Sequence, residues 1–229
     1  MALYAIGDLH LCLGVPKPMD VFGGAWVGYM DKLKEGMSII THEDTTVLLG
    51  DLSWALDLPS SRADFAWMND IPGRKIILKG NHDYWWSTAS KFNKFCQENH
   101  FENFHLLNNN AYEYNGYAIC GTRGWFFEEE RSGQHDEKVF RRELMRLEAS
   151  LKAAGDKEKI VFLHYPPRYK GYECTEILQL LSKYGVRRCF YGHLHGGSHK
   201  LAMEGLWDGV EFRLVAADYI SFKPFPVLF

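Results

Sequence analysis

Four apolar segments of this sequence end in a glycine that is followed at once by a residue able to bind a metal ion. They end in Gly7-Asp8-Leu9-His10, Gly50-Asp51, Gly80-Asn81-His82-Asp83 and Gly192-His193-Leu194-His195, and a fifth apolar segment ends at His164. In an α/β sheet, ligands bind in the crevice beyond the carboxyl ends of the strands. We therefore expect these polar ends to converge although they lie far apart along the chain.

The spacing and number of these residues indicate a metal site. Within the first and last segments the polar residues are two positions apart, so each pair projects to one side of an extended chain. The full set is Asp8, His10, Asp51, Asn81, His164, His193 and His195. Seven carboxylate, amide and imidazole ligands are too many for one tetrahedral zinc ion, but they suit two cations that share a bridging carboxylate.

A simpler interpretation exists for each segment taken alone. An Asp after a glycine at the end of a strand commonly closes a turn or caps a helix. Any one segment alone favours this simpler interpretation, whereas five segments with ligand residues in a known order reverse the weighting.

The series GDLH, GDLSW, GNHD, LHYP and GHLH resembles the motifs of the calcineurin-like metallophosphoesterase superfamily, in the order of that superfamily, over residues 8–195. The resemblance implies an α/β fold, a four-layer αββα sandwich in which helices flank two mixed β-sheets. It also implies a binuclear metal centre. Trp54 departs from the commonest form of the second motif, which has a small or acidic residue there, and this affects the rim of the pocket rather than the metals.

The resemblance also implies a role for each motif residue. The first metal would be held by Asp8, His10, Asp51 and His195, and the second by Asp51, Asn81, His164 and His193, with Asp51 as the bridge. His82 matches the residue that protonates the leaving oxygen, and Asp83 would orient and charge its imidazole.

The implied activity is hydrolysis of a small phosphomonoester or phosphodiester by attack of a metal-bridging hydroxide. The cofactors would be two divalent metal ions, manganese, iron or zinc foremost, because these ions accept mixed oxygen and nitrogen ligands. One alternative is a non-catalytic metal-binding scaffold of the same fold, which the retention of every ligand and of His82 disfavours. Another is a nuclease. It would need a basic groove, whereas 26 Lys and Arg stand against 29 Asp and Glu, a net charge of -3.

Aromatic residues near the motifs either complete the core or wall a substrate pocket. The second interpretation gives substrate contacts to Trp85 and Trp125, with Tyr84 beside them. Arg123 either binds a phosphate with its planar donor fork or forms a surface salt bridge.

Short apolar runs alternate with longer amphipathic stretches, as is typical of an α/β sheet. We expect strands at Leu3 to Ile6, Thr46 to Leu49, Lys75 to Leu78, Phe104 to Leu107, Ala111 to Tyr114, Tyr117 to Cys120, Ile160 to Leu163, Arg188 to Tyr191 and Val210 to Ala216. We expect helices at Ala25 to Glu35, Ser61 to Asp70, Thr88 to Glu98, Glu137 to Ala154 and Glu173 to Lys183. Asn115-Gly116 predicts a type I′ hairpin. Arg123 to Gln134 is expected to be a long loop, and the tail Tyr219 to Phe229 either covers a sheet edge or forms an oligomer contact.

Composition limits the class of protein. With 229 residues, 46% of them hydrophobic, residues 1–229 can form one domain. Five scattered cysteines without a C-x-x-C pair are expected to be reduced. The first residues lack the basic region of a signal peptide, and no apolar run approaches the roughly 18 to 20 residues that span a bilayer. We therefore expect a cytoplasmic protein that acts on a small phosphorylated substrate, with no membrane partner and nucleic acid disfavoured as a partner; the oligomeric state is not predicted.

Overall fold

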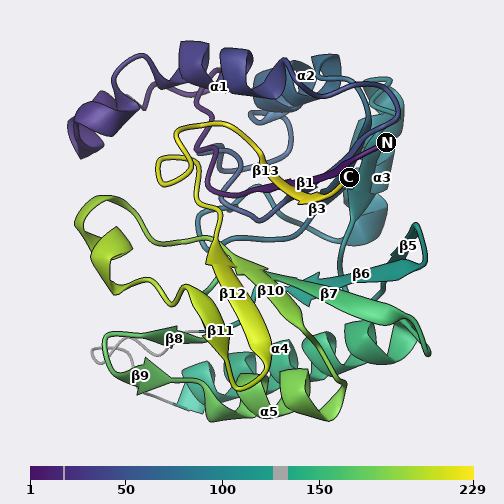
Figure 1. Cartoon of the computed structure of the whole chain (residues 1–229). Helices are drawn as coiled ribbons and strands as arrows, with labels where there is room; N and C mark the ends of the chain where they lie inside the picture. The colour runs from purple at the N-terminus through teal and green to yellow at the C-terminus, as the bar shows by residue number, and fades with distance from the viewer. Residues whose placement is uncertain (18, 126–133) are drawn as a thin grey trace. The chain divides into compact units, whose positions relative to one another are not determined.

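Two mixed β-sheets organise the chain, and each belongs to a different unit of it (Figure 1). The computed structural model describes residues 1–17, 19–125 and 134–229, with the side chains of 134–136 left out. Unit 1 comprises Met1–Leu106 and Val215–Phe229, and unit 2 comprises Leu107–Leu214. Helices accompany both sheets, so the predicted α/β class with two mixed sheets is confirmed. The prediction of one domain over the whole chain stays a prediction.

The sheet of unit 1 has the strand order β13-β1-β2-β3-β4. Its parallel strands are β1 (Leu3–Ile6), β2 (Thr45–Leu48), β3 (Arg74–Ile77) and β4 (Phe104–Leu106). The tail strand β13 (Phe225–Leu228) pairs antiparallel with β1. All four residues of β2 are buried. Burial on both faces explains why these strands appear in the sequence as short apolar runs rather than as alternating patterns.

Three helices of unit 1 connect its parallel strands and bury their apolar faces in one core. They are α1 (Tyr29–Met37), α2 (Arg62–Asp70) and α3 (Ala89–Glu98). Phe65 of α2 is at the centre, with ring centroids 4.9 Å from Trp85 and 5.4 Å from Phe92. Two short 3-10 helices, η1 (Asp20–Phe22) and η2 (Gly24–Trp26), precede α1.

The sheet of unit 2 has the order β11-β12-β10-β7-β6-β5. Its centre consists of parallel strands: β6 (Tyr117–Thr122), β7 (Glu158–Leu163), β10 (Arg188–Tyr191) and β12 (Val210–Leu214). Antiparallel strands β5 (Tyr112–Tyr114) and β11 (Gly205–Trp207) form its edges. The remaining elements are α4 (Gln134–Ala153), α5 (Thr175–Lys183), the 3-10 helix η4 (Gly196–Leu201) and a hairpin of β8 (Arg168–Tyr169) and β9 (Tyr172–Glu173).

Every strand and helix expected from the sequence is present, and most have shifted ends. Helix α1 begins at Tyr29 rather than Ala25 because Gly28 has a φ of 63°, which no helix continues. The type I′ hairpin is confirmed by φ angles of 46° at Asn115 and 83° at Gly116. The tail covers a sheet edge, as one of the two alternatives predicted. Residues 126–133 of the expected long loop lie outside the described residues.

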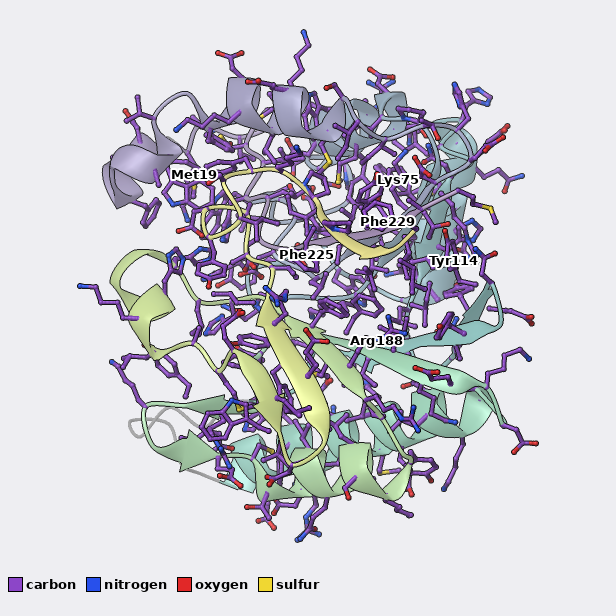
Figure 2. All side chains as sticks on the ribbon, in the orientation of Figure 1. Met19, Lys75, Tyr114, Arg188, Phe225 and Phe229 are labelled. Carbon is purple, nitrogen blue, oxygen red and sulfur yellow. The ribbon has the colours of Figure 1, made fainter. Side chains whose placement is uncertain are left out.

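A buried lysine closes the loop before a central strand in each unit. The ammonium of Lys75 (Figure 2) donates to the carbonyls of Ile71, Pro72 and Gly73, and burial lowers its pKa to about 8. The ammonium of Lys159 donates to two carbonyls of the loop before β7, at 2.8 and 3.0 Å.

The five cysteines are free thiols, as expected. In the described parts of the chain, no helix combines the length and the apolar composition that crossing a bilayer requires.

Candidate metal centre

The predicted ligands of unit 1 follow the carboxyl ends of β1, β2 and β3. These strands are parallel neighbours, with Ile6 opposite Leu48 and Leu48 opposite Ile77. The residues that follow them therefore share one edge of the sheet, as expected for a ligand site. These residues are Asp8, His10, Asp51 and Asn81, together with His82 and Asp83.

The backbone is left-handed at three of these ligands. The φ angles are 61° at Asp8, 47° at His10 and 50° at Asp51. Neighbouring segments hold this conformation. The amide of Asp8 donates to the carbonyl of Gly50 and the amide of His10 donates to the carbonyl of Asp51, each at 2.9 Å. Non-glycine residues in this region cost free energy and are concentrated at functional sites.

Gly50 and Gly80 have no side chains, and this leaves the space around the Asp51 carboxylate. A Cβ on Gly80 would lie 2.0 Å from Oδ1 of Asp51, and a Cβ on Gly50 would lie 2.4 Å from the amide nitrogen of Gly80. The same Oδ1 accepts a 2.7 Å hydrogen bond from the amide of His82. The other oxygen of Asp51 lies 4.0 Å from Nε2 of His10. The predicted bridging carboxylate is thus fixed beside a second predicted ligand.

The carboxylate of Asp83 accepts four hydrogen bonds at this edge of unit 1. Its Oδ2 accepts from the amides of Gly80 (2.7 Å) and Asp51 (2.8 Å), and its Oδ1 accepts from the amide of Leu52 (2.8 Å) and Nε1 of Trp85 (2.9 Å). Burial raises the pKa of Asp83, and these donors oppose the rise because they bind the ionised form. Among the described residues Asp83 makes no hydrogen bond to the His82 ring. The orientation of His82 that the resemblance implies therefore does not occur through a direct bond.

A second buried carboxylate, Asp64 in the first turn of α2, was not expected from the sequence. It accepts a 2.7 Å hydrogen bond from the amide of Leu13 and another from the hydroxyl of Ser53. It thereby ties the segments that follow β1 and β2 to the helix. Burial raises its pKa, and both donors oppose the rise. The signal in the sequence was an acid on the helix face that carries Phe65 and Met68, which are also buried.

In unit 2, the predicted ligands follow β7 and β10, which are parallel and paired with Leu163 opposite Tyr191. His164 is fully buried. Its amide donates to the carbonyl of Arg123 at 3.1 Å, and its carbonyl accepts from Gly192 at 3.1 Å. The His164 and His193 ring centroids are 5.2 Å apart, and His193 has a φ of 73°.

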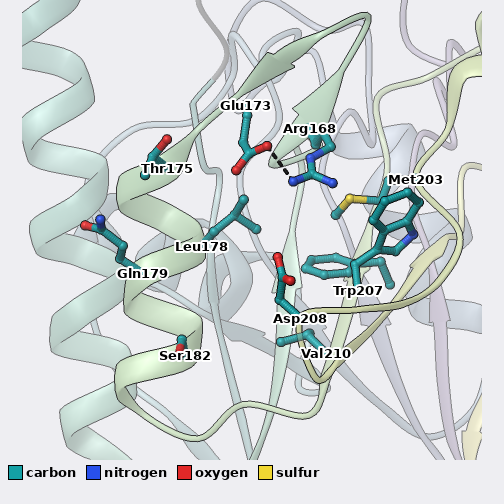
Figure 3. A pocket seen from close by; sticks show the side chains of 11 residues that line it. Arg168, Glu173, Thr175, Leu178, Gln179, Ser182, Met203, Trp207, Asp208 and Val210 are labelled. Atoms are coloured by element: carbon teal, nitrogen blue, oxygen red, sulfur yellow. Dashed lines mark hydrogen bonds and ion pairs between the residues drawn. The ribbon is translucent and has the colours of Figure 1, made fainter.

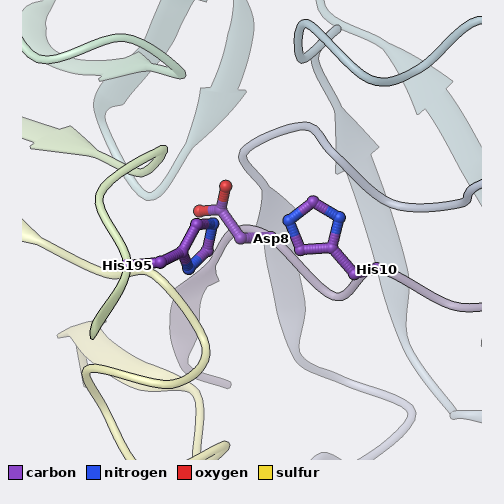
Figure 4. A group of neighbouring side chains, drawn as sticks. All are labelled: Asp8, His10 and His195. Carbon is purple, nitrogen blue, oxygen red and sulfur yellow. The ribbon is translucent and has the colours of Figure 1, made fainter. Parts of the chain in front are cut away.

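Figure 4 shows which segments carry three of the predicted ligands. Asp8 and His10 come from the segment that leaves β1, and His195 comes from the loop that follows β10. His195 precedes the first residue of η4 and is half-buried.

The predicted substrate contacts have separate outcomes. Trp85 is 2% exposed and packs in the core of unit 1. It is therefore not available to a substrate, and the alternative that it completes the core is confirmed. Arg123 pairs with the buried Glu143 at 3.7 Å, and its guanidinium lies 5.4 Å from the ring centroid of Trp125. The contacts of Arg123 and Trp125 with a substrate stay predictions.

A pocket of about 260 Å³ opens on unit 2 beside α5 (Figure 3). The guanidinium of Arg168 pairs with Glu173 at 2.5 Å and lies 5.1 Å from the ring centroid of Trp207. The pocket is lined by Arg168, Glu173, Thr175, Leu178, Gln179, Ser182, Met203, Trp207, Asp208, Val210 and Phe212. None of the predicted ligands is among them.

The side chains suited to hold metal ions are oxygen and nitrogen donors. They are Asp8, His10 and Asp51 in unit 1, and His164, His193 and His195 in unit 2. Asp8 and Asp51 are 0% and 1% exposed. A buried carboxylate needs positive charge or strong donors around it, and a divalent cation supplies that charge. These residues therefore fit the metal ions that the motifs imply.

The fold is similar to that of several solved structures. A protein of unknown function from Aquifex aeolicus, AQ665, has 16% identity and a TM-score of 0.52 over 98% of this chain and 95% of that chain. Phosphopantetheinyl hydrolase from Mycobacterium tuberculosis has 14% identity and a TM-score of 0.59, over 99% and 95%. TT1561 from Thermus thermophilus has 14% identity and a TM-score of 0.58, over 99% and 97%. At these identities the likeness concerns the fold alone. A search of curated proteins found no matching sequence.

The family model of the calcineurin-like phosphoesterases matches residues 1–197. This range begins in unit 1, runs through most of unit 2 and contains all the predicted ligands. Two mixed sheets with accompanying helices are consistent with the fold of this family. The chain therefore belongs to the calcineurin-like phosphoesterase family.

Proposed function

We propose that this chain is a hydrolase that cleaves a small phosphomonoester or phosphodiester and uses two divalent metal ions. Membership of the family supports metal-dependent phosphoester hydrolysis in general. The observation that carries the proposal is the left-handed backbone at Asp8, His10 and Asp51, held by neighbouring segments at the carboxyl edge of the sheet. Strain of this kind is kept where function requires it.

The ligand sets are part of the proposal. One ion would be held by Asp8, His10, Asp51 and His195, and the other by Asp51, Asn81, His164 and His193. When bound, two such ions neutralise phosphate oxygens and lower the pKa of a water molecule for attack on phosphorus. Asp51 serves both ions, which agrees with the space that Gly80 leaves for its carboxylate.

His82 is the proposed proton donor to the leaving oxygen. Its ring is half-buried, with centroids 4.6 Å from Trp54 and 6.1 Å from Tyr84, which is 57% exposed. Aromatic neighbours limit the rotation of the imidazole, and partial exposure leaves it accessible to a substrate. These are the conditions that a general acid needs.

The test is metal-restored turnover. Metal-stripped protein receives manganese, iron or zinc, and hydrolysis of p-nitrophenyl phosphate is followed beside that of bis-p-nitrophenyl phosphate. A phosphopantetheinyl ester joins these substrates because a hydrolase of that name has a similar fold. We expect turnover with at least one ester. The ratio between the first two substrates assigns the monoester or diester class.

Two variants locate the activity. Asp51→Asn should lose metal and turnover together, because it removes the negative charge that would bridge two ions. Asp57→Asn, an exposed carboxylate six residues later, is the matched control and should keep both. Metal bound by the wild type without turnover on any ester would favour the scaffold alternative, and equal metal content in Asp51→Asn would refute the proposed bridge.

A further inference from the structure

Trp54 lies against two histidines of unit 1. Its ring is stacked on His10 at 20°, with centroids 4.8 Å apart, and is 4.6 Å from the ring of His82. Its indole N–H donates to the sulfur of Met19 at 3.0 Å, and its amide donates to the carbonyl of Leu11 at 2.9 Å. Both ends of this residue are therefore fixed beside the proposed ligand and the proposed proton donor.

Lys17 places a positive charge on this ring. Its ammonium lies 2.9 Å from the centroid of the Trp54 ring. The centroid of the Trp54 ring is 4.6 Å from the centroid of the His82 ring. The distance from the Lys17 ammonium to the His82 ring is therefore at most the sum of these two distances. A cation is attracted to the face of an indole, which gives the lysine a defined position.

Among the described residues, no carboxylate forms an ion pair with Lys17. The indole occupies one side of the ammonium but accepts none of its three N–H bonds as a carboxylate would. The group thus keeps its capacity for charge-assisted hydrogen bonds, which are the strong ones that phosphate and carboxylate oxygens form with lysine.

We infer that Lys17 and Trp54 form a subsite for a second anionic group, which the substrate carries on the leaving side of the scissile bond. The inference rests on the proposed function, in which His82 is beside the leaving oxygen. Lys17 and His82 both lie against the Trp54 ring, so an anion bound to Lys17 is near the leaving part of the substrate, whose oxygen His82 would protonate. The substrate class is a phosphoester or phosphoanhydride with a further phosphate or carboxylate close to the bond that breaks.

The kinetic test compares substrates that differ in that second charge. Glycerol 3-phosphate has none, 3-phosphoglycerate has a carboxylate, and pyrophosphate has a second phosphate. With metal restored, we expect kcat/KM of the wild type to be about tenfold or more higher for the doubly anionic substrates. Lys17→Met should reduce this ratio to near one, mainly through KM, and Lys17→Arg should keep most of it. Of 3-phosphoglycerate and pyrophosphate, the one with the larger kcat/KM relative to glycerol 3-phosphate shows whether the subsite takes a carboxylate or a phosphate.

Lys32→Met is the matched control. Lys32 also lies over an aromatic ring of unit 1, with its ammonium 5.6 Å from the centroid of Phe222, and it donates to the carbonyl of Ala25. Loss of this lysine should leave the substrate ratio unchanged. A ratio that falls equally in both variants would refute the subsite.

A binding test reads the same subsite without turnover. Pyrophosphate added to the metal-free protein should change tryptophan fluorescence, and this change should be lost in Lys17→Met and in Trp54→Phe. If the wild type hydrolyses no ester at all, the proposed function fails and the subsite falls with it. If it hydrolyses esters while Lys17→Met keeps the wild-type ratio and fluorescence change, the subsite alone is refuted.

Discussion

Main-chain hydrogen bonds hold predicted ligands in both units, and the units differ in how closely a buried carboxylate supports those ligands. In unit 1, the buried carboxylate of Asp83 accepts directly from the amide of the predicted ligand Asp51, and Asp64 fixes the neighbouring segments. In unit 2, the amide of His164 donates to the carbonyl of Arg123. The buried carboxylate there, Glu143, acts one step away, through the side chains of Thr122 (2.6 Å) and Arg123.

This difference predicts which side chains can be substituted with little effect. A main-chain bond survives most substitutions, whereas no uncharged side chain offers the four acceptor positions of a carboxylate. Unit 1 should therefore be the more sensitive of the two to single changes beside its ligands. Two comparisons test this expectation, and a pH dependence within unit 1 follows them.

The largest expected effect comes from Asp83→Ala. Four N–H donors lose their acceptor, and each buried unsatisfied donor costs about 1–3 kcal/mol. We expect a loss of unfolding free energy of about 3 kcal/mol or more, together with loss of metal binding. Urea denaturation measures the first and metal analysis the second.

Glu143→Gln in unit 2 is the counterpart. The side-chain amide oxygen introduced at position 143 still accepts from the hydroxyl of Thr122, so we expect the unfolding free energy to fall by about 1–2 kcal/mol. Equal losses in the two variants would mean that the two units do not differ in this respect.

The second comparison concerns glycines. Gly80→Ala brings a Cβ into the Asp51 carboxylate, which must move. A displaced ligand of about 1 Å can cost on the order of 100-fold in activity. Gly124→Ala in unit 2 meets nothing closer than 3.5 Å, and its φ of 74° is the source of strain. We expect about 1–2 kcal/mol of stability to be lost there, with turnover reduced less than in Gly80→Ala. A larger loss of turnover in Gly124→Ala would reverse the comparison.

The smallest expected change at each step is a pH dependence from Lys75 in unit 1, because it is spread over the whole range between its folded-state and ordinary pKa values. Its folded-state pKa of about 8 is below the ordinary lysine value of 10.5. Between these values the unfolded chain binds more protons than the folded one, so stability rises with pH. We expect the unfolding free energy to increase from pH 8 toward 10.5 by no more than about 1.4 kcal/mol per pH unit. Lys75→Met should lack this increase, and a parallel increase in both proteins would assign it to other groups.

Much of the fold follows from local patterns. The strands Leu3–Ile6 and Arg188–Tyr191 have the predicted bounds, because short buried runs between turn residues are visible in the sequence. The small strands β8, β9 and β11 were not expected. The strands β8 and β9 have two residues each, which is too short for a periodic pattern. The signal that could have predicted β11 is the turn Asp208-Gly209, which joins it to β12.

The sequence by itself determined the order of the five motifs, the strands that precede them and the family to which they belong. Tertiary structure alone decided the partners of Asp64 and Asp83, the burial of Trp85 and the position of Lys17 on Trp54. The physical reason is the separation along the sequence of the residues that make each feature. Motifs and apolar periodicity are written in consecutive residues, whereas a hydrogen bond between residues 11 or 31 positions apart depends on the packing of whole elements.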